Sequence, residues 1–282
     1  MSSLPPPPVL ACIRHPGRET GRLCTRCGQP ACADCLTQVA VGSHCVDCIK
    51  AATPPLGQRL NFWRAGQHVL ATKVLMAANV AVFIYLIARD PNSASGSIGA
   101  GHRQLGLYRF AVSQGEWWRM ITSGFIHFGI IHLAFNMLAL WNLGQMLERV
   151  VGTPKFVALY FSALLAGSAG VLILERPDAV ALTGGASGAV FGLFGATAVL
   201  LHRRGINPFR TNLGIMLLIN LGLTFTIPGI SIGGHIGGLV GGAICGLVLD
   251  AHRGRPTPER IQWLVFAAVA AVSLIVGILI SR

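Results

Sequence analysis

Charged side chains are scarce in this sequence of 282 residues. They make up 11% of the chain, whereas hydrophobic residues make up 52%, and a typical soluble domain has about 25% charged residues. This shortage excludes an ordinary soluble globular protein and predicts one that lies in a lipid bilayer. The net charge of +12 could indicate a nucleic-acid-binding protein. The basic residues, however, lie in short segments between apolar runs, which is typical of topology signals and of contacts with anionic lipid headgroups, so we expect no nucleic-acid partner.

Acidic residues are absent from the middle of every long apolar run. The chain has only ten, namely Glu19, Asp34, Asp47, Asp90, Glu116, Glu148, Glu175, Asp178, Asp250 and Glu259. This distribution excludes an intramembrane protease with two catalytic aspartates and a Ser-His-Asp triad at depth. It also argues against an ion- or proton-coupled transporter, which needs charges inside the membrane. A cleavable signal peptide is not expected either, because Met1 to Pro8 is polar and then proline-rich.

Cysteine is almost confined to the first 48 residues, which hold seven of the eight. Three CxxC pairs and one CxxH pair supply eight potential ligands, enough for about two structural Zn²⁺ ions. The ligands are Cys12, His15, Cys24, Cys27, Cys32, Cys35, Cys45 and Cys48, with His44 as a possible substitute. Disulfides are the alternative interpretation. Thiolates that hold zinc need a reducing compartment, so we expect this module to be cytosolic.

Seven apolar segments follow, each approaching the roughly 20 residues that a membrane-spanning helix needs. We predict helices over residues 69–88, 119–146, 155–174, 185–202, 211–227, 232–250 and 260–280. The predicted fold class is an all-α polytopic membrane protein. Its parts are a disordered N-terminus (1–11), the zinc-binding module (12–48), a linker (49–68), a six-helix core (69–250) and a seventh helix with the C-terminus (251–282).

The basic residues also predict an orientation. With a cytosolic N-terminus, more of them lie in inside segments than in outside ones. The inside set is Arg59, Arg64, Lys73, Arg149, Lys155, Arg203, Arg204, Arg210, Arg253, Arg255 and Arg260, against Arg89, Arg103, Arg109, Arg119 and Arg176 outside. Seven spans would place the C-terminus outside. We expect a multi-pass protein of the plasma (inner) membrane.

Polar groups inside the apolar segments are candidates for function, because such groups are costly in hydrocarbon. Ser187 begins one predicted helix among glycines, where backbone N–H groups without internal partners could stabilise an oxyanion. His235 lies in another, and glycines recur every four residues in both segments. If these glycine strips face each other, the two side chains can form a nucleophile and its general base. The alternatives are a packing or capping serine and a histidine that binds a backbone carbonyl.

A third apolar segment holds His127, His132 and Asn136. His132 and Asn136 are four residues apart, hence on one face of a helix, and we expect them to act together as hydrogen-bond donors. His127 turns away from that face, so we expect a structural hydrogen-bonding role for it. A metal site is the alternative for the two histidines, but their spacing is not that of HExxH and no glutamate lies between them.

Taken together, these residues resemble the rhomboid family of intramembrane serine proteases over about residues 69–250. The matching motifs are Glu116-Trp-Trp-Arg119, the run from His127 to Asn136, Gly185-Ala-Ser187-Gly188 and Gly234-His235-Ile-Gly-Gly238. The resemblance implies a Ser187 nucleophile, a His235 base and an oxyanion hole of His132, Asn136 and the Ser187 N–H. It implies supporting roles for Trp118, Arg119, Glu148 (an acid after the second helix) and the motif glycines Gly185, Gly188 and Gly238.

The implied activity is cleavage of single-span membrane proteins near the outer end of their transmembrane helix, without a cofactor for catalysis. One departure is Phe191, which replaces a tyrosine that stacks on the catalytic histidine in many members. The cysteine-rich module resembles a B-box-type zinc finger, which implies an interaction with a cytosolic partner whose identity cannot be read. A non-catalytic, rhomboid-like binder of transmembrane clients is the alternative function.

Overall fold

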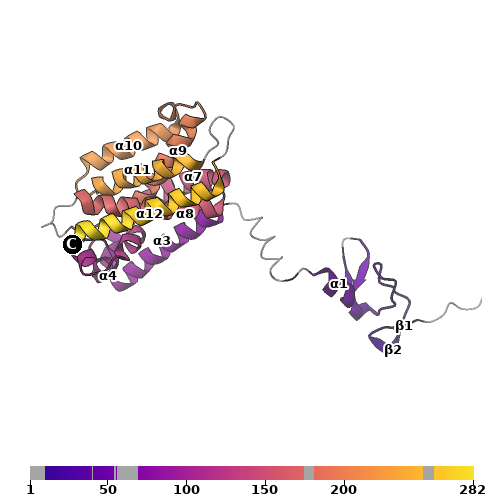
Figure 1. Ribbon diagram of the computed structural model, residues 1–282. Coiled ribbons are helices and arrows are strands. Elements are labelled where there is room, and N and C mark those ends of the chain that lie inside the picture. The colour runs from indigo at the N-terminus through magenta and orange to yellow at the C-terminus, as the bar shows by residue number, and fades with distance from the viewer. Residues whose placement is uncertain (1–9, 40, 54, 56–68, 175–180, 250–256) are drawn as a thin grey trace, which may run out of the picture. The chain divides into compact units, whose positions relative to one another are not determined.

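Two compact units, residues 1–67 and 68–282, make up the chain in the computed structural model (Figure 1). The structure describes residues 10–39, 41–53, 55, 69–174, 181–249 and 257–282. The predicted disorder of residues 1–9 and most of the predicted linker, 54 and 56–68, lie outside this described part. Residues 10 and 11 are not disordered as expected but belong to a strand, and residues 49–52 of the expected linker belong to a helix.

The small unit is built from short strands around cysteines. Strand β1 (Leu10–Cys12) pairs antiparallel with β2 (His15–Thr20), and β3 (Leu36–Gln38) with β4 (Ser43–Cys45). The short helix η1 (Ala33–Cys35) precedes β3, and α1 (Val46–Ala52) follows β4. The buried cluster of the unit consists of five cysteines and Ala31. With no large aliphatic side chain in this cluster, the unit depends on its cysteines for a core.

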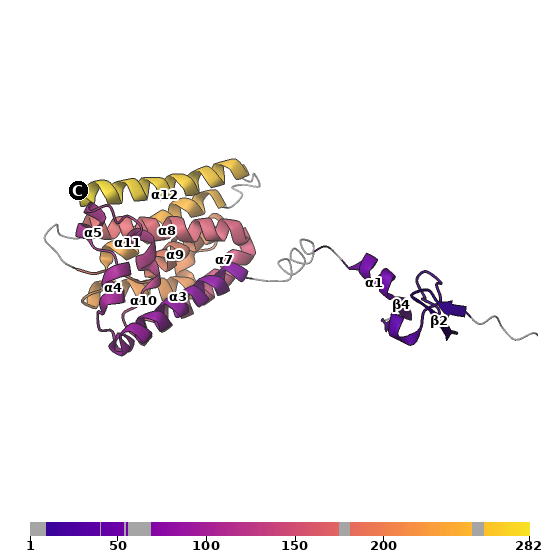
Figure 2. The same ribbon diagram turned by 90° about the horizontal axis from the view of Figure 1, so that it is seen from below.

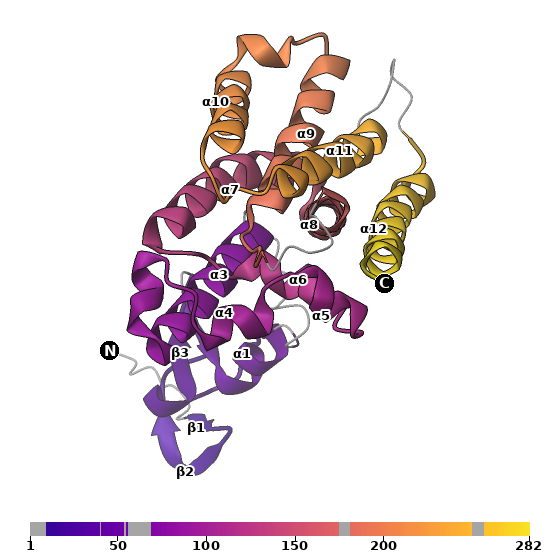
Figure 3. The ribbon, with the colours of Figure 1, turned by 90° about the vertical axis from the view of Figure 1, so that its left-hand side faces the viewer.

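The second unit is helical, and Figure 3 shows its long helices gathered around α8. In the described part of this unit, five helices are long and apolar enough to cross a membrane, and α9 and α10 are shorter apolar helices of 17 and 15 residues. The five are α3 (Leu70–Arg89), α7 (Ile130–Val151), α8 (Thr153–Leu174), α11 (Ile232–Leu249) and α12 (Glu259–Ser281), and the shorter two are α9 (Ser187–Arg203) and α10 (Asn212–Thr226). The chain is thus a multi-pass membrane protein of the expected all-α class.

Short elements fill the connections between the long helices. Between α3 and α7 lie η2 (Pro91–Ser95), α4 (Ala100–Leu105), α5 (Arg109–Ser113), α6 (Arg119–Thr122) and η3 (Ser123–Phe125), and η4 (Pro208–Arg210) lies between α9 and α10. Figure 2 shows α4 and α5 at the end of the unit where α12 terminates. Arg109 of α5 donates hydrogen bonds to the carbonyls of Ile280 in α12 and Leu172 in α8. The C-terminal ends of both helices therefore lie at the end of the unit that carries α5.

The predicted helix over residues 119–146 is wrong at both ends. Residues 119–125 form α6 and η3, the chain is extended at Ile126, and α7 begins only at Ile130 and continues to Val151. Gly129 has a φ of +90°, which an α-helix cannot contain. His127 therefore precedes α7 instead of lying on it, and Glu148 lies within the helix and not after it.

The glycine strips of α9 and α11 do face each other, as predicted. A Cβ atom added at Gly238 would collide with the carbonyl oxygen of Gly188, and one added at Gly242 with that of Gly192. From the four-residue spacing we expected Gly184, Gly188 and Gly192 to form the strip on α9. Gly184 does not belong to it, because α9 begins at Ser187 and Gly184 packs on Ile126 instead. The close approach of the two backbones strengthens van der Waals packing. This packing matters in a membrane, because the hydrophobic effect does not drive helices together there.

A second glycine face on α11 packs against α8. A Cβ atom added at Gly233 would collide with the carbonyl oxygen of Gly170, and one at Gly237 with that of Ala166. Helix α11 is thus held between α8 and α9 on two faces with almost no side-chain volume. This contact fixes the height and rotation of α11, and with them the position of His235.

We expect Gly242→Ala to destabilise the helical unit by about 1–3 kcal/mol, because the added methyl group must push α9 and α11 apart. Gly222→Ala on α10 is the matched control, since no atom lies within 4 Å of a Cβ atom at that glycine. Thermal unfolding of the detergent-solubilised protein measures both. Equal melting temperatures for the two variants would contradict the tight contact.

Candidate active site

Ser187 and His235 meet at the contact between α9 and α11. Ser187 is the first residue of α9, and His235 lies in the first turn of α11. The Nε2 atom of His235 is 2.8 Å from the Oγ atom of Ser187. The histidine is buried, with 8% of its surface exposed, whereas the serine is half-buried. This is the distance at which an imidazole can take the proton of an attacking hydroxyl.

The ring of Phe191 stacks on the imidazole of His235. Their centroids are 4.0 Å apart, and the ring planes differ by 15°. Phe191 lies one turn after Ser187 on α9 and is buried. The stack defines the plane of the imidazole ring, for which a phenyl ring without a hydroxyl group suffices.

Thr224 of α10 binds the other nitrogen of the imidazole, and sequence reasoning missed it. Its Oγ1 atom is 2.7 Å from Nδ1 of His235, and both residues are buried. The missed signal was a hydroxyl group inside the apolar segment 211–227, the same kind of observation that pointed to Ser187. Its place beside His235 could not be inferred, because it depends on how α10 packs.

His132 and Asn136 lie in the first two turns of α7, and the His132 ring lies near the serine. The Nδ1 atom of His132 accepts a hydrogen bond from the Phe128 N–H at 3.3 Å, so the proton of a neutral ring is on Nε2. A Cβ atom added at Gly185 would be 2.9 Å from this Nε2 and 3.7 Å from the Ser187 Oγ. The donor of His132 and the hydroxyl of Ser187 therefore border the same small space, which the bare backbone of Gly185 leaves open.

The Asn136 amide donates one hydrogen bond to the backbone carbonyl of His132, at 2.9 Å. An amide nitrogen carries two protons. One proton therefore fixes the side chain to its own helix, and the second can be donated to another acceptor.

His127 does not have the hydrogen-bonding side chain that we expected. Both ring nitrogens are buried and make no hydrogen bond of good geometry within the described residues, although the Phe125 carbonyl is near enough to interact with the ring. The ring instead packs edge-on against His132, with centroids 5.0 Å apart. The backbone carbonyl of His127 lies 3.2 Å from Nε2 of His102. Its contribution is thus packing behind His132 and a main-chain link to α4.

Arg119 ties the connection before α7 together. Its side chain is buried, pairs with Glu116 at 2.5 Å and donates to the carbonyls of Arg103 and Gly106 at 2.5 and 2.9 Å. Its guanidinium also lies over the ring of Tyr108. The neighbouring Trp118 is 45% exposed and lies on the surface of this connection.

Glu148 is a buried acceptor at the other end of the helical unit. Its carboxylate accepts hydrogen bonds from the N–H groups of Ala71 and Thr72 and from the hydroxyls of Thr72 and Thr153, all at 2.7 to 2.8 Å. It therefore caps the free N–H groups at the start of α3 and joins α3 to α7 and α8.

Residues 114–252 match the family model of the rhomboid domain. The chain carries a rhomboid domain. It is 38% identical over 172 residues to the rhomboid protease GluP of Bacillus subtilis, a match covering 60% of this chain and 32% of that protein. It is 30% identical over 174 residues to rhomboid-like protease 1 of Toxoplasma gondii, covering 59% and 57%. The matches thus span less than two thirds of these relatives.

The matched residues contain Ser187, His235, His132 and Asn136, so the whole site lies inside the rhomboid domain. Helix α3 precedes the match and α12 follows it. The boundaries 69–250 that we gave the core stay a prediction.

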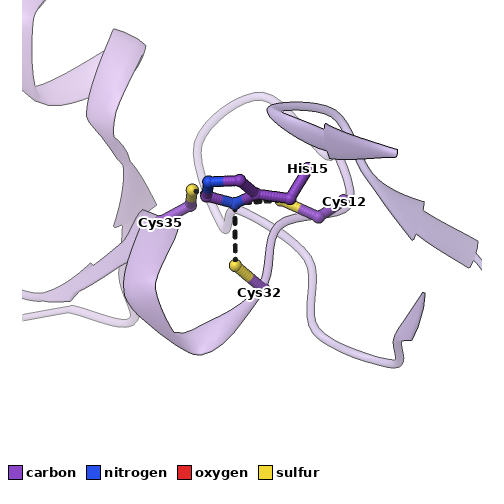
Figure 4. A group of neighbouring side chains, drawn as sticks. All are labelled: Cys12, His15, Cys32 and Cys35. Carbon is purple, nitrogen blue, oxygen red and sulfur yellow. Dashed lines mark hydrogen bonds between the residues drawn. The ribbon is translucent and has the colours of Figure 1, made fainter. Parts of the chain in front are cut away.

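Before the rhomboid domain, the cysteine-rich unit holds two groups of four potential metal ligands. One is Cys12, His15, Cys32 and Cys35, and the other is Cys24, Cys27, Cys45 and Cys48. The pairs alternate along the chain, so each group joins two distant segments. Figure 4 shows the first group, in which Nδ1 of His15 faces three sulfur atoms at 3.4 to 3.8 Å. All eight cysteines of the chain are free, which argues against the disulfide alternative.

At least one thiol in each group has a lowered pKa, which favours the thiolate. Backbone N–H groups, that of Cys32 foremost, lower the pKa of Cys12 to about 6. Burial acts to raise the pKa of Cys24, but the N–H groups of Cys45, Cys27 and Arg26 outweigh it and bring that pKa to about 6. His44, the possible substitute ligand, belongs to neither group.

We expect Glu148→Gln to lower the stability of the helical unit by about 2 kcal/mol or more, because an amide NH₂ would face backbone donors that now bind a charged oxygen. Glu259→Gln is the control, because Glu259 is exposed and lies 3.4 Å from Lys155. Chemical or thermal unfolding in detergent gives both values. A loss no larger than that of the control would show that Glu148 does not hold α3 in place.

Proposed function

We propose that this protein is an intramembrane serine endopeptidase that cleaves single-span membrane proteins near the outer leaflet. The observation that carries this proposal is the 2.8 Å contact between the His235 Nε2 and the Ser187 Oγ. The relatives named rhomboid proteases support the same reaction class.

In the proposed reaction the Ser187 oxygen attacks the carbonyl carbon of the substrate peptide bond. Its proton moves to Nε2 of His235, and the C–N bond then breaks as this proton passes to the leaving amine. Water, deprotonated by the same nitrogen, hydrolyses the acyl-enzyme. No cofactor takes part in these steps. Within the described residues no carboxylate contacts the imidazole of His235, so neutral neighbours must hold it.

The negative oxygen of the tetrahedral intermediate needs donors beside Ser187. The N–H of Ser187 is the first of α9 and has no partner within its own helix. We assign the other donors to Nε2–H of His132 and to the amide of Asn136. Preorganised donors of this kind typically contribute about 10²–10³ in rate each. Phe191, Gly185, Gly188 and Gly238 would support this machinery by packing, and Trp118 and Arg119 by ordering the connection above it.

The proposed topology is that of a plasma (inner) membrane protein with a cytosolic N-terminus and an outside C-terminus. The bridge between Leu107 and Thr183 brings the chain before Ser187 to the end that carries α4 and α5. Basic residues at the opposite end, Lys155 and Arg203 among them, favour that end as cytosolic. Because α9 has 17 residues, it is about 25 Å long, shorter than the hydrocarbon core of about 30 Å. Ser187 would then lie just below the outer surface.

The cysteine-rich unit would hold about two structural Zn²⁺ ions. Both four-ligand groups are drawn together with all ligand atoms within 4.8 Å of one another, and sulfur with imidazole nitrogen is the donor set that zinc prefers. This unit would serve a cytosolic partner, while anionic lipid headgroups would contact the basic connections.

A fluorophosphonate probe should label the purified protein, and Ser187→Ala should abolish the labelling because the nucleophile is gone. His235→Ala should reduce it by at least about 10³, because the serine loses its base. Ser162→Ala is the matched control, since this buried serine of α8 donates to the Phe266 carbonyl of α12. Cleavage of a single-span substrate in proteoliposomes is measured in parallel. Absence of both labelling and cleavage in the wild type would favour the non-catalytic binder.

The purified full-length chain should carry about two zinc ions by elemental mass spectrometry, and Cys24→Ser should reduce this to about one, because only one group loses a ligand. Cys245→Ala is the control, since Cys245 lies buried in α11. A zinc content that is unchanged in Cys24→Ser would show that the second group does not bind the metal.

A further inference from the structure

The proposed dyad needs its imidazole in one tautomer. His235 can accept the serine proton only if Nε2 carries a lone pair, which places the ring proton on Nδ1. In serine proteases with a triad, a buried aspartate fixes this tautomer. The side-chain hydrogen bonds of His235 within the described residues go to Ser187 and Thr224, and neither partner is charged.

The hydrogen bond that the Thr224 hydroxyl donates determines the tautomer of His235. The hydroxyl donates to the backbone carbonyl of Asn220, one turn earlier on α10, at 2.7 Å. A hydroxyl has one proton. With that proton directed at Asn220, the Thr224 oxygen can only accept from His235, so Nδ1 must be the protonated nitrogen and Nε2 must present its lone pair to Ser187.

The surroundings of Thr224 strengthen this arrangement. The side chain is 2% exposed, so water does not compete for the Nδ1–H. The remaining buried residues of α10 are Gly214 and Leu217, while much of the helix is exposed, Leu218 and Phe225 included. A buried polar residue on a helix that otherwise has an apolar surface is expensive in a membrane unless it has a partner.

From this geometry we infer that Thr224 is the positioning residue of the catalytic base: it fixes His235 in the Nδ1–H tautomer and replaces the carboxylate of a triad with a neutral oxygen. This inference rests on the proposed function. The imidazolium that forms when Nε2 takes the serine proton keeps the same Nδ1–H bond, so the ring need not rotate during the reaction. Phe191 restricts the plane of the ring, and Thr224 restricts its rotation within that plane.

The kinetic test uses Thr224→Val, which keeps the shape of the side chain but cannot accept the hydrogen bond. We expect kcat for a single-span substrate to fall by about tenfold or more with little change in KM, because the wrong tautomer becomes populated. Thr224→Ser keeps the oxygen and should remain within about threefold of the wild type. Thr226→Val is the matched control, since Thr226 is exposed and its hydroxyl bonds to carbonyls of its own helix.

The spectroscopic test reads the tautomer directly from the imidazole nitrogen resonances of ¹⁵N-histidine-labelled protein, with His235 assigned by the peaks that vanish in His235→Ala. The wild type should show a protonated Nδ1 and an unprotonated Nε2, and Thr224→Val should show a mixture. A wild-type ring protonated on Nε2 overturns the inference even if Thr224→Val does not fold. So does a Thr224→Val enzyme as active as Thr226→Val. A wild type without Ser187-dependent cleavage would instead refute the proposed function.

Discussion

The backbone-to-backbone contact between α9 and α11 is the constraint on which the site depends. Packed helices usually lie about 8–10 Å apart, and the side chains at the contact set the separation. Here the carbonyl oxygens of Gly188 and Gly192 occupy the space that side chains at Gly238 and Gly242 would need. The second glycine face of α11, against α8, removes its remaining freedom to slide. The distance between Ser187 and His235 is therefore a property of the whole helix packing and not of the two side chains.

Much of this arrangement follows from the sequence, because its cause is local. Hydrophobic runs predict the helices, four-residue glycine spacing predicts the facing strips, and Cys-x-x-Cys spacing predicts the potential metal ligands. The start of α7 could not be predicted in the same way. Phe125, Ile126 and Phe128 continue the apolar pattern without a proline, but the chain is extended at Ile126 and has a positive φ at Gly129, so α7 does not begin earlier. The wrong boundary led directly to the wrong environment for His127.

The roles that depend on distant partners were also beyond the sequence. Thr224 looks like any threonine in an apolar helix until α10 is placed beside α11. The four ligand pairs of the cysteine-rich unit could combine in three ways, and spacing does not choose between them. In the structure the first pair along the chain combines with the third, and the second with the fourth, so each four-ligand group closes a different loop of the chain. The unit has too little aliphatic surface to do this with a hydrophobic core.

A base without a carboxylate suits a site buried in a bilayer. A buried aspartate would need partners for its own charge, and an ion in a medium of low polarity costs several kcal/mol even after relaxation. The imidazole of His235 is instead held by three neutral groups on two helices: the ring of Phe191, the hydroxyl of Ser187 and the oxygen of Thr224. Each restricts a different freedom of the ring, and none adds a charge. Among the described residues of the helical unit, the one deeply buried carboxylate is that of Glu148, and four donors surround it at a helix start. The cost of a buried charge without partners thus explains both why Glu148 lies among four hydrogen-bond donors and why neutral groups contact His235.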